Sequence, residues 1–301
     1  MEFSNGKIKI SADTRDNILE HDGKYYQIDF LNNDGKYVQG GNGTVFKLSH
    51  EEENSEFVIK IIKFPNQRSD DWYTKKRIIR FEREIEALSV AKTNEVAGIV
   101  SIEFSGELDI DGFTFQYYVM QRCELTLKEY LVKYADDLNL VQKTLLCRKI
   151  LQGIQGLHDY KMYHRDIKHS NIYFIGHEPL IGDLGLVDYQ NTDYFINERG
   201  DLIGPTGWFS PEAINKHLVE KNINRSLFDC RIDDKSEVFQ LGKLFWYIYQ
   251  GNIPIGQIVL EDFLPRNQEI FEILFDMLKY SKSSRIDATN VAGRLDSYLS
   301  T

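Results

Sequence analysis

Cysteine is scarce in this sequence, and long apolar runs are missing from it. The three cysteines are widely spaced and match neither a disulfide framework nor a zinc-ligand pattern. The seven histidines show no metal-ligand spacing such as HExxH. Apolar runs fall well short of the roughly 20 residues of a membrane helix, and the first residues contain no apolar signal core. We therefore expect a reduced, cytoplasmic protein with no membrane partner.

Positive charge is outnumbered in this chain. Lysine and arginine total 36 against 46 aspartates and glutamates, which gives a formal net charge of −10. An acidic surface repels phosphate backbones, so we expect no nucleic-acid partner. The hydrophobic and charged fractions, 42% and 27%, are ordinary for a globular protein. A length of 301 residues is sufficient for two lobes, each with its own core.

The most informative stretch is residues 161–185. It contains His164-Arg165-Asp166, then Lys168 and Asn171, and later Asp183-Leu184-Gly185. Two carboxylates and one amide thus stand at the ends of short apolar runs. Oxygen ligands of this kind suit Mg²⁺, which keeps several waters and takes one or two carboxylates together with substrate phosphates. The stretch predicts a site that holds a divalent cation and orients a hydroxyl nucleophile.

This stretch closely resembles the catalytic loop and metal-binding motif of the protein kinase family, HRDxKxxN followed by DFG. The resemblance implies that Asp166 orients the substrate hydroxyl and that Lys168 neutralises charge on the transferred phosphoryl group. It also implies that Asn171 and Asp183 hold the magnesium ions. Leu184 replaces the usual phenylalanine and keeps an apolar plug. A single Asp-Ile-Lys or Asp-Leu-Gly triplet would be an ordinary surface turn, but the combination in this order is specific.

A run of glycines precedes the first strongly apolar strand. Gly40, Gly41 and Gly43 allow backbone amides to approach phosphates without interference from a Cβ atom. A plain hairpin turn explains the run equally well. In the kinase pattern GxGxxGxV, Gly40 and Gly43 match the second and third glycines and Val45 matches the valine over the adenine. Val38 stands where the first glycine is usual.

Lys60 lies inside the apolar run 57–62, where burying an unpaired ammonium is costly. One explanation is an edge lysine whose ammonium reaches solvent. The resemblance instead implies the lysine of VAIK, which contacts the α- and β-phosphates of ATP and pairs with a glutamate. Apolar residues at helical spacing predict a helix over residues 75–92. Glu84 borders its apolar stripe and is the expected partner of Lys60.

Two further strands are predicted over 99–104 and 113–120, joined by a polar turn at 109–112. The resemblance makes Met120 the gatekeeper and places the backbone of Gln121 and Cys123 against the adenine edge. We expect the thiol of Cys123 to be inert. The remaining nucleotide-binding residues that the resemblance implies are Val58 and Tyr173.

The second half of the chain has helical spacing and further resemblance to the family. Residues 204–212 resemble GTxxYxAPE, although Thr206 lies one position later than the usual threonine. The resemblance predicts that Glu212 forms a buried ion pair with Arg285. Glu237 stands where the family usually has an aspartate that binds the catalytic-loop backbone. His158 is expected to be a hydrogen-bonded core histidine rather than a metal ligand.

Two regulatory or specificity features remain open in the sequence. Arg165 resembles the arginine of kinases that are switched by phosphorylation in the activation segment. The candidate acceptors are Tyr189, Thr192 and Tyr194, and Asp188 stands near the place of a second basic residue. The segment 213–236 contains more residues than the kinase family usually has at this place. It is either a solvated loop with a short helix or an insertion that helps to select protein substrates.

The resemblance covers residues 30–300 and implies an α+β, bilobal fold with MgATP in the cleft. We expect an N-terminal extension over 1–29, an antiparallel β-sheet lobe with one helix over 30–122, and a mainly helical lobe over 123–301. Lys168 is typical of Ser/Thr kinases, so the expected reaction is transfer of the γ-phosphoryl group of ATP to protein hydroxyls, with autophosphorylation. The departures at Val38, Thr206 and Glu237 leave a catalytically weak scaffold open, and a small-molecule kinase of related fold is the other alternative. The sequence contains no signal for an oligomeric state.

Overall fold

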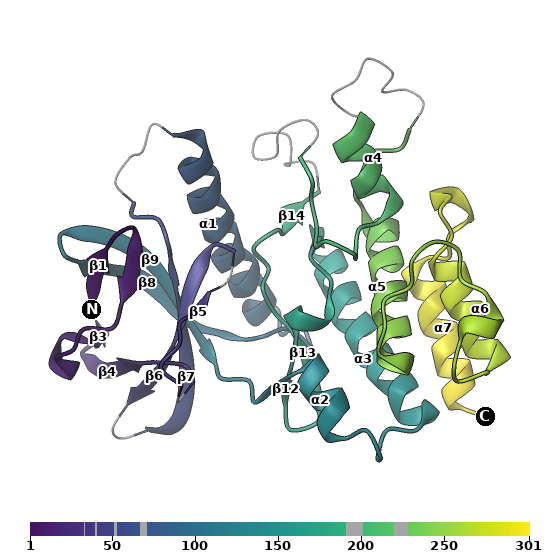
Figure 1. Ribbon diagram of the computed structural model, residues 1–301, viewed down its shortest axis with the longest axis horizontal. Coiled ribbons are helices and arrows are strands. Elements are labelled where there is room, and N and C mark those ends of the chain that lie inside the picture. The colour runs from purple at the N-terminus through teal and green to yellow at the C-terminus, as the bar shows by residue number, and fades with distance from the viewer. Residues whose placement is uncertain (33, 40, 51–52, 67–70, 191–200, 220–227) are drawn as a thin grey trace. The chain divides into compact units, whose positions relative to one another are not determined.

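The computed structural model describes residues 1–32, 34–39, 41–50, 53–66, 71–190, 201–219 and 228–301. The chain divides into two compact units, drawn in Figure 1. The first unit comprises Met1–Asn94 and Val100–Arg122, and the second comprises Glu95–Ile99 and Cys123–Thr301.

An antiparallel sheet with the strand order β3-β4-β6-β7-β9-β8 dominates the first unit, and β5 also pairs with β6. Its central strand β7 contains the apolar run around Lys60. Ile59, Ile61 and Ile62 are fully buried, as expected for a strand that is covered on both faces. The strand bounds are β3 Ile18–His21, β4 Lys24–Asp29, β5 Val38–Gln39, β6 Gly43–His50, β7 Glu53–Ile62, β8 Ile102–Ile110 and β9 Phe113–Gln121.

The N-terminal residues form two separate hairpins. The alternating segments 7–10 and 25–30, with the turn Asp22-Gly23 between them, suggest that they pair with each other, but Asp22-Gly23 joins β3 to β4, so 24–29 pairs with 18–21. Both turn residues have positive φ, 50° and 75°, as two-residue hairpin turns require. Residues 7–10 contribute instead to the small hairpin of β1 (Glu2–Ser4) and β2 (Lys7–Lys9). Short-range alternation predicted strands here but could not choose their partners.

The helix α1 spans Trp72–Thr93 and supplies the remaining core of this unit. It begins earlier than the apolar spacing predicted, because Asp71 caps it by accepting a hydrogen bond from the Thr74 amide. Phe81 and Leu88 are buried along its apolar stripe. Phe81 lies against Tyr118 of β9, with ring centroids 5.5 Å apart, so the stripe packs on the sheet.

Helices dominate the second unit. The helix α5 is its centre: Leu241, Leu244 and Phe245 are fully buried, and α3, α4, α6 and α7 contact it. The helices are α2 Leu127–Lys133, α3 Leu140–Asp159, α4 Pro211–Val219, α5 Asp234–Gln250, α6 Gln268–Met277 and α7 Ala288–Leu299. The short strands are β10 Leu125–Thr126, β11 Met162–Tyr163, β12 Ile172–Ile175, β13 Glu178–Ile181 and β14 Asp188–Tyr189.

The predicted α+β class is therefore confirmed, with an antiparallel sheet and one helix preceding a mainly helical region. In the described ranges, no helix combines the length and the apolar character needed to cross a membrane. Residues 220–227 of the predicted insertion at 213–236 lie outside the described residues. The insertion begins within α4, which ends at Val219, and its last residues begin α5.

A buried ion pair joins α4 to the segment between α6 and α7. The Arg285 guanidinium donates to both carboxylate oxygens of Glu212, at 3.2 and 2.9 Å. It also donates to the backbone carbonyls of Lys235 and Lys279. The sequence predicted this pair, which is one of the most separated in the unit, at 73 residues.

Replacing Arg285 with lysine should lower the free energy of unfolding by about 1.5–3 kcal/mol, because the ammonium cannot reproduce these forked hydrogen bonds. Urea titration of Arg285→Lys measures the loss. The exposed Arg266→Lys variant is the matched control and should unfold as the wild type does. Equal midpoints for Arg285→Lys and the control would contradict the expectation.

Candidate active site

Two side chains of α5 form hydrogen bonds with the backbone of the predicted catalytic loop. The loop follows β11, and Arg165 adopts a left-handed backbone conformation with φ of 66°. Its amide donates to Oε1 of Glu237 at 2.6 Å, and its carbonyl accepts from the Gln240 side chain at 3.5 Å. Glu237 is fully buried. The longer carboxylate therefore reaches the loop, as the resemblance requires of the usual aspartate.

Asp166 is the centre of the loop's side-chain cluster. The Lys168 ammonium donates to Oδ2 of Asp166 at 2.8 Å, and the Asn171 amide donates to the same oxygen at 2.9 Å. Asn171 also donates to the Asp166 carbonyl at 2.9 Å. Asp166 is 7% exposed. Both side-chain bonds end on one oxygen, so the carboxylate is oriented without either bond engaging Oδ1.

The β12–β13 hairpin brings Asp183 close to this cluster. Ile172 pairs with Ile181 at the open end of the hairpin, and the Gly182 amide donates to the Asn171 carbonyl at 3.0 Å. Asp183 follows directly and has a φ of 58°. A non-glycine residue in this region is uncommon and concentrates at functional sites.

His164 connects the two segments. Its Nδ1 accepts a hydrogen bond from the Asp166 amide at 3.2 Å. The ring proton therefore lies on Nε2, which donates to the Gly182 carbonyl at 3.1 Å. The fully buried ring thus fixes the distance between the catalytic loop and the residue before Asp183.

The side-chain oxygens of the predicted metal-binding residues are of the kind that binds a magnesium ion. The Asn171 amide nitrogen donates to Asp166. Its side-chain oxygen, which accepts from the Ser170 hydroxyl at 3.5 Å, would be the coordinating atom. Asp183 follows Gly182, whose amide binds the Asn171 backbone carbonyl, and would add a carboxylate. A hard cation that takes few protein oxygens and completes its shell with phosphates and water matches this set. Asn171 and Asp183 are therefore the residues that would hold the ion.

In the first unit, Lys60 and Glu84 form the predicted ion pair. The ammonium lies 2.7 Å from Oε1 of Glu84, and the two side chains are 6% and 0% exposed. The Tyr118 hydroxyl donates to the same carboxylate oxygen at 2.9 Å. The alternative of an edge lysine that reaches solvent is wrong.

Strand register places several predicted nucleotide-binding residues on one face of the sheet. Val45 is opposite Lys60, and Val58 is opposite Met120. Because paired residues and alternate residues share a face, all four side chains project to the same side. Gly43 lies on this face as well. A Cβ atom there would come within 2.8 Å of Cγ of Lys60, so glycine is needed for the lysine to fit.

The other predicted nucleotide-binding residues are placed as follows. Gly41 is exposed in the β5–β6 turn, whereas Gly40 lies outside the described residues. Gln121 ends β9 in the first unit. In the second unit, Tyr173 is half-buried in β12 opposite Thr126. Burial, with a smaller contribution from Glu124, raises the pKa of the Cys123 thiol to about 11, so the thiol is protonated and unreactive at neutral pH.

Three contacts at these sites were not predicted. Arg77 of α1 donates to the Asn42 side chain at 2.8 Å and ties the glycine-rich turn to the helix. His158 lies 2.6 Å from Oε2 of Glu237, which confirms a hydrogen-bonded core histidine and supplies its partner. Arg165 forms an ion pair with Asp188. Each contact joins elements that are separated in sequence, and no sequence pattern indicated which residues would pair.

The predicted activation-segment features are only partly described. Tyr189 lies in β14, paired with Met162 of β11, whereas Thr192 and Tyr194 lie outside the described residues. Thr206 is exposed in the turn that Pro205 and Trp208 close. Ser210 is buried, and its hydroxyl accepts from the Ala213 amide at the start of α4.

The His158–Glu237 pair predicts a pH-dependent stability. Burial alone would lower the pKa of His158, but the hydrogen bond and charge of Glu237, aided by Asp234 and Asp159, outweigh burial and raise the pKa above 6.5. The folded protein then holds the proton more tightly than the unfolded chain. Its contribution is complete below pH 6.5 and is lost as the pH rises through the raised pKa.

Unfolding free energies measured between about pH 6 and pH 8 should therefore fall with pH in the wild type and change less in His158→Gln. The exposed His217→Gln variant is the control and should retain the wild-type slope. Parallel pH profiles for wild type and His158→Gln would show that this pair does not carry the effect.

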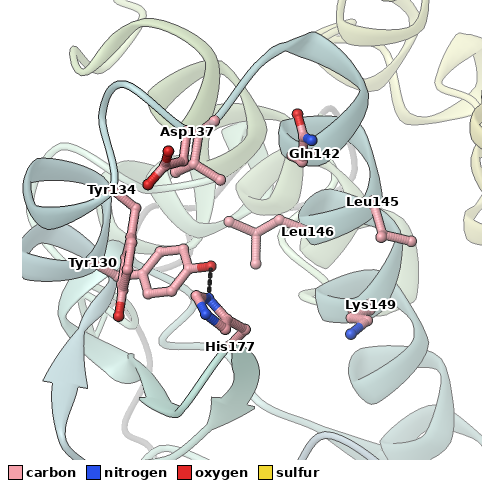
Figure 2. Close-up of a pocket in the computed structure, with 9 residues that line it drawn as sticks. Tyr130, Tyr134, Asp137, Gln142, Leu145, Leu146, Lys149 and His177 are labelled. Atoms are coloured by element: carbon pink, nitrogen blue, oxygen red, sulfur yellow. Dashed lines mark hydrogen bonds between the residues drawn. The ribbon is translucent and has the colours of Figure 1, made fainter.

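A pocket of about 490 Å³ opens in the second unit, away from these residues. Figure 2 shows it between α2, α3 and the β12–β13 turn, with the Tyr130 hydroxyl bonded to Nδ1 of His177 at 3.0 Å. Leu146 and Lys149 of α3 form the opposite wall. None of the residues predicted to bind nucleotide or metal lines it.

Comparison with known proteins identifies the class. The family model described as the protein kinase domain matches residues 33–293, so this chain belongs to the protein kinase family. It is 25% identical over 207 residues to the serine/threonine-protein kinase dst1 of Dictyostelium discoideum, covering 68% of this chain and 24% of that protein.

Two further relatives have similar overlap. A probable serine/threonine-protein kinase of Encephalitozoon cuniculi is 25% identical over 207 residues, covering 69% of this chain and 34% of the relative. The dual specificity protein kinase TTK of Mus musculus is 21% identical over 222 residues, covering 73% and 24%. This chain spans about a quarter to a third of the length of these curated relatives. Membership of the family implies ATP and a divalent metal in general.

Proposed function

We propose that this chain is a Ser/Thr protein kinase that transfers the γ-phosphoryl group of MgATP to hydroxyls of proteins, its own included. The cluster of Lys168 and Asn171 on the Asp166 carboxylate is the observation that carries the proposal. The backbone bond from Gly182 to Asn171 attaches the residue before Asp183 to this cluster. Lys168 and the names of two of the three relatives described above support serine and threonine as acceptors.

The geometry of the second unit supports the following roles. Asp166, oriented through Oδ2, accepts a hydrogen bond from the substrate hydroxyl and aims it at the phosphorus. Lys168 stands 2.8 Å from that carboxylate and offsets negative charge as the phosphoryl group moves. Asn171 and Asp183 would hold magnesium, which would supply charge neutralisation at the phosphate oxygens.

The proposed roles in the first unit concern nucleotide binding. Lys60, paired with Glu84, contacts the α- and β-phosphates, and Gly40, Gly41 and Gly43 offer backbone amides to phosphate oxygens. Val45, Val58 and Met120, with Gln121, Cys123 and Tyr173, contact the adenine. The proposal includes an N-terminal extension over 1–29, a β-sheet lobe over 30–122 and a helical lobe over 123–301. It also includes a cytoplasmic location. The three free cysteines agree with a reducing compartment.

Incubation of the purified chain with γ-labelled ATP, Mg²⁺ and a cell lysate tests the proposal. The expected result is label on serine and threonine of proteins, identified by mass spectrometry and absent with Asp166→Asn. Label confined to a metabolite would indicate a small-molecule kinase, and label confined to tyrosine would contradict the acceptor class. No label above the Asp166→Asn background would reject the activity.

A further inference from the structure

Arg165 and Asp188 form a buried ion pair next to the catalytic loop. Nη1 of Arg165 lies 3.1 Å from Oδ2 of Asp188, and the two side chains are 2% and 8% exposed. The pairing of β11 with β14 creates this contact. Tyr163 is opposite Asp188 in that ladder, so the aspartate stands two residues from the arginine across the strand pair.

A buried guanidinium needs a compensating anion, because an uncompensated charge at this depth is strongly destabilising. The sequence left open a phosphate on Tyr189, Thr192 or Tyr194 as that anion. The structure provides the Asp188 carboxylate instead. A phosphate brought to the same guanidinium would stand beside that carboxylate, and like charges at such distances repel.

Arg165 is also the residue through which the loop is anchored. Its amide is bound by Glu237, its carbonyl by Gln240, and its side chain by Asp188. The next residue is Asp166. These three contacts of Arg165 fix the backbone from which the Asp166 side chain projects. The third contact is made by the carboxylate of Asp188, not by a phosphate group.

We propose that Asp188 is a positioning residue that takes the part of an activation-segment phosphate, so that phosphoryl transfer by this chain does not require phosphorylation of that segment. The inference rests on the proposed kinase function. Asp188 contacts neither substrate nor nucleotide in this proposal. Asp188 influences the reaction through Arg165, which positions Asp166.

The test compares two forms of the wild-type chain, one treated with a phosphatase that is then removed and one allowed to autophosphorylate. Initial rates are measured with labelled MgATP and dephosphorylated casein, and intact mass is recorded at the end of each assay. The expected rates agree within about twofold, whereas a loss of more than about tenfold on dephosphorylation would overturn the inference. Transfer by neither form would count against the kinase function itself, which separates the two failures.

Two variants test the role of Asp188 directly. Asp188→Asn should lower kcat about tenfold or more while changing KM for ATP much less, and Asp188→Glu should recover most of the loss because it restores the carboxylate. A merely structural role predicts that both variants lose thermal stability and that kcat returns to the wild-type value once rates are divided by the folded fraction. Wild-type kcat in Asp188→Asn, or no recovery in a folded Asp188→Glu, would overturn the inference. The phosphatase comparison stands on the wild type if Asp188→Asn fails to fold.

Discussion

Asp166→Asn is expected to lower kcat for phosphoryl transfer about 10²- to 10⁴-fold, the usual contribution of a positioned base. Asparagine has nearly the same shape and keeps an oxygen that can accept from Lys168 and Asn171. The cluster should therefore persist while the negative charge that orients the substrate hydroxyl is lost. Steady-state kinetics with casein and MgATP measure the change, and KM for ATP should change little.

The control for this variant is Asp136→Asn, which makes the same substitution at an exposed residue of the second unit. It should leave both kcat and KM unchanged. Retention of a measurable wild-type kcat by Asp166→Asn would show that the carboxylate has no part in the reaction. Signals at background in both proteins would favour the catalytically weak scaffold.

Separating Lys60 from Glu84 should cost both stability and activity. Lys60→Met leaves a buried carboxylate without its cation, and Glu84→Gln leaves a buried ammonium without its anion. Removal of one partner of a buried pair typically costs about 3–5 kcal/mol. Urea titration, with amide protection in β7 as a local readout, should show a loss of this size in each single variant.

The double variant Lys60→Met/Glu84→Gln separates the loss of stability from the loss of activity. It removes both charges and keeps an acceptor for the Tyr118 hydroxyl, so most of the lost stability should return. Phosphoryl transfer should not return, because the cation for the phosphates is still missing. Recovery of transfer in the double variant would show that the pair is structural only.

The sequence was most informative where function requires a fixed local order of residues. Asp166, Lys168 and Asn171 occupy one short loop, so their spacing alone indicated the cluster that the structure contains. Lys60 was identifiable because a lysine in an apolar strand needs a compensating anion, and Glu84 was the carboxylate on the apolar edge of the next helix. The α+β class was implied by the resemblance to the kinase family, and the helical spacing in the second half of the chain agrees with it.

Contacts set by tertiary packing could not be predicted in this way. The partner of Arg165 depends on the β11–β14 ladder, whose strands are only two residues long and carry no periodic signal. The bond between His158 and Glu237 spans 79 residues and joins two helices. Residues 7–10 and 18–21 both alternate enough to pair with 24–29, and only the two-residue turn at Asp22-Gly23 decides between them.

The most direct test of the account is the metal dependence of phosphoryl transfer in the wild type and in Asp183→Asn. If Asp183 and Asn171 hold the magnesium of ATP, transfer to casein should rise with Mg²⁺ in the wild type. In a folded Asp183→Asn chain it should remain at background at the same concentrations. Wild-type rates in Asp183→Asn, or transfer in the wild type that does not respond to divalent cation, would contradict the account.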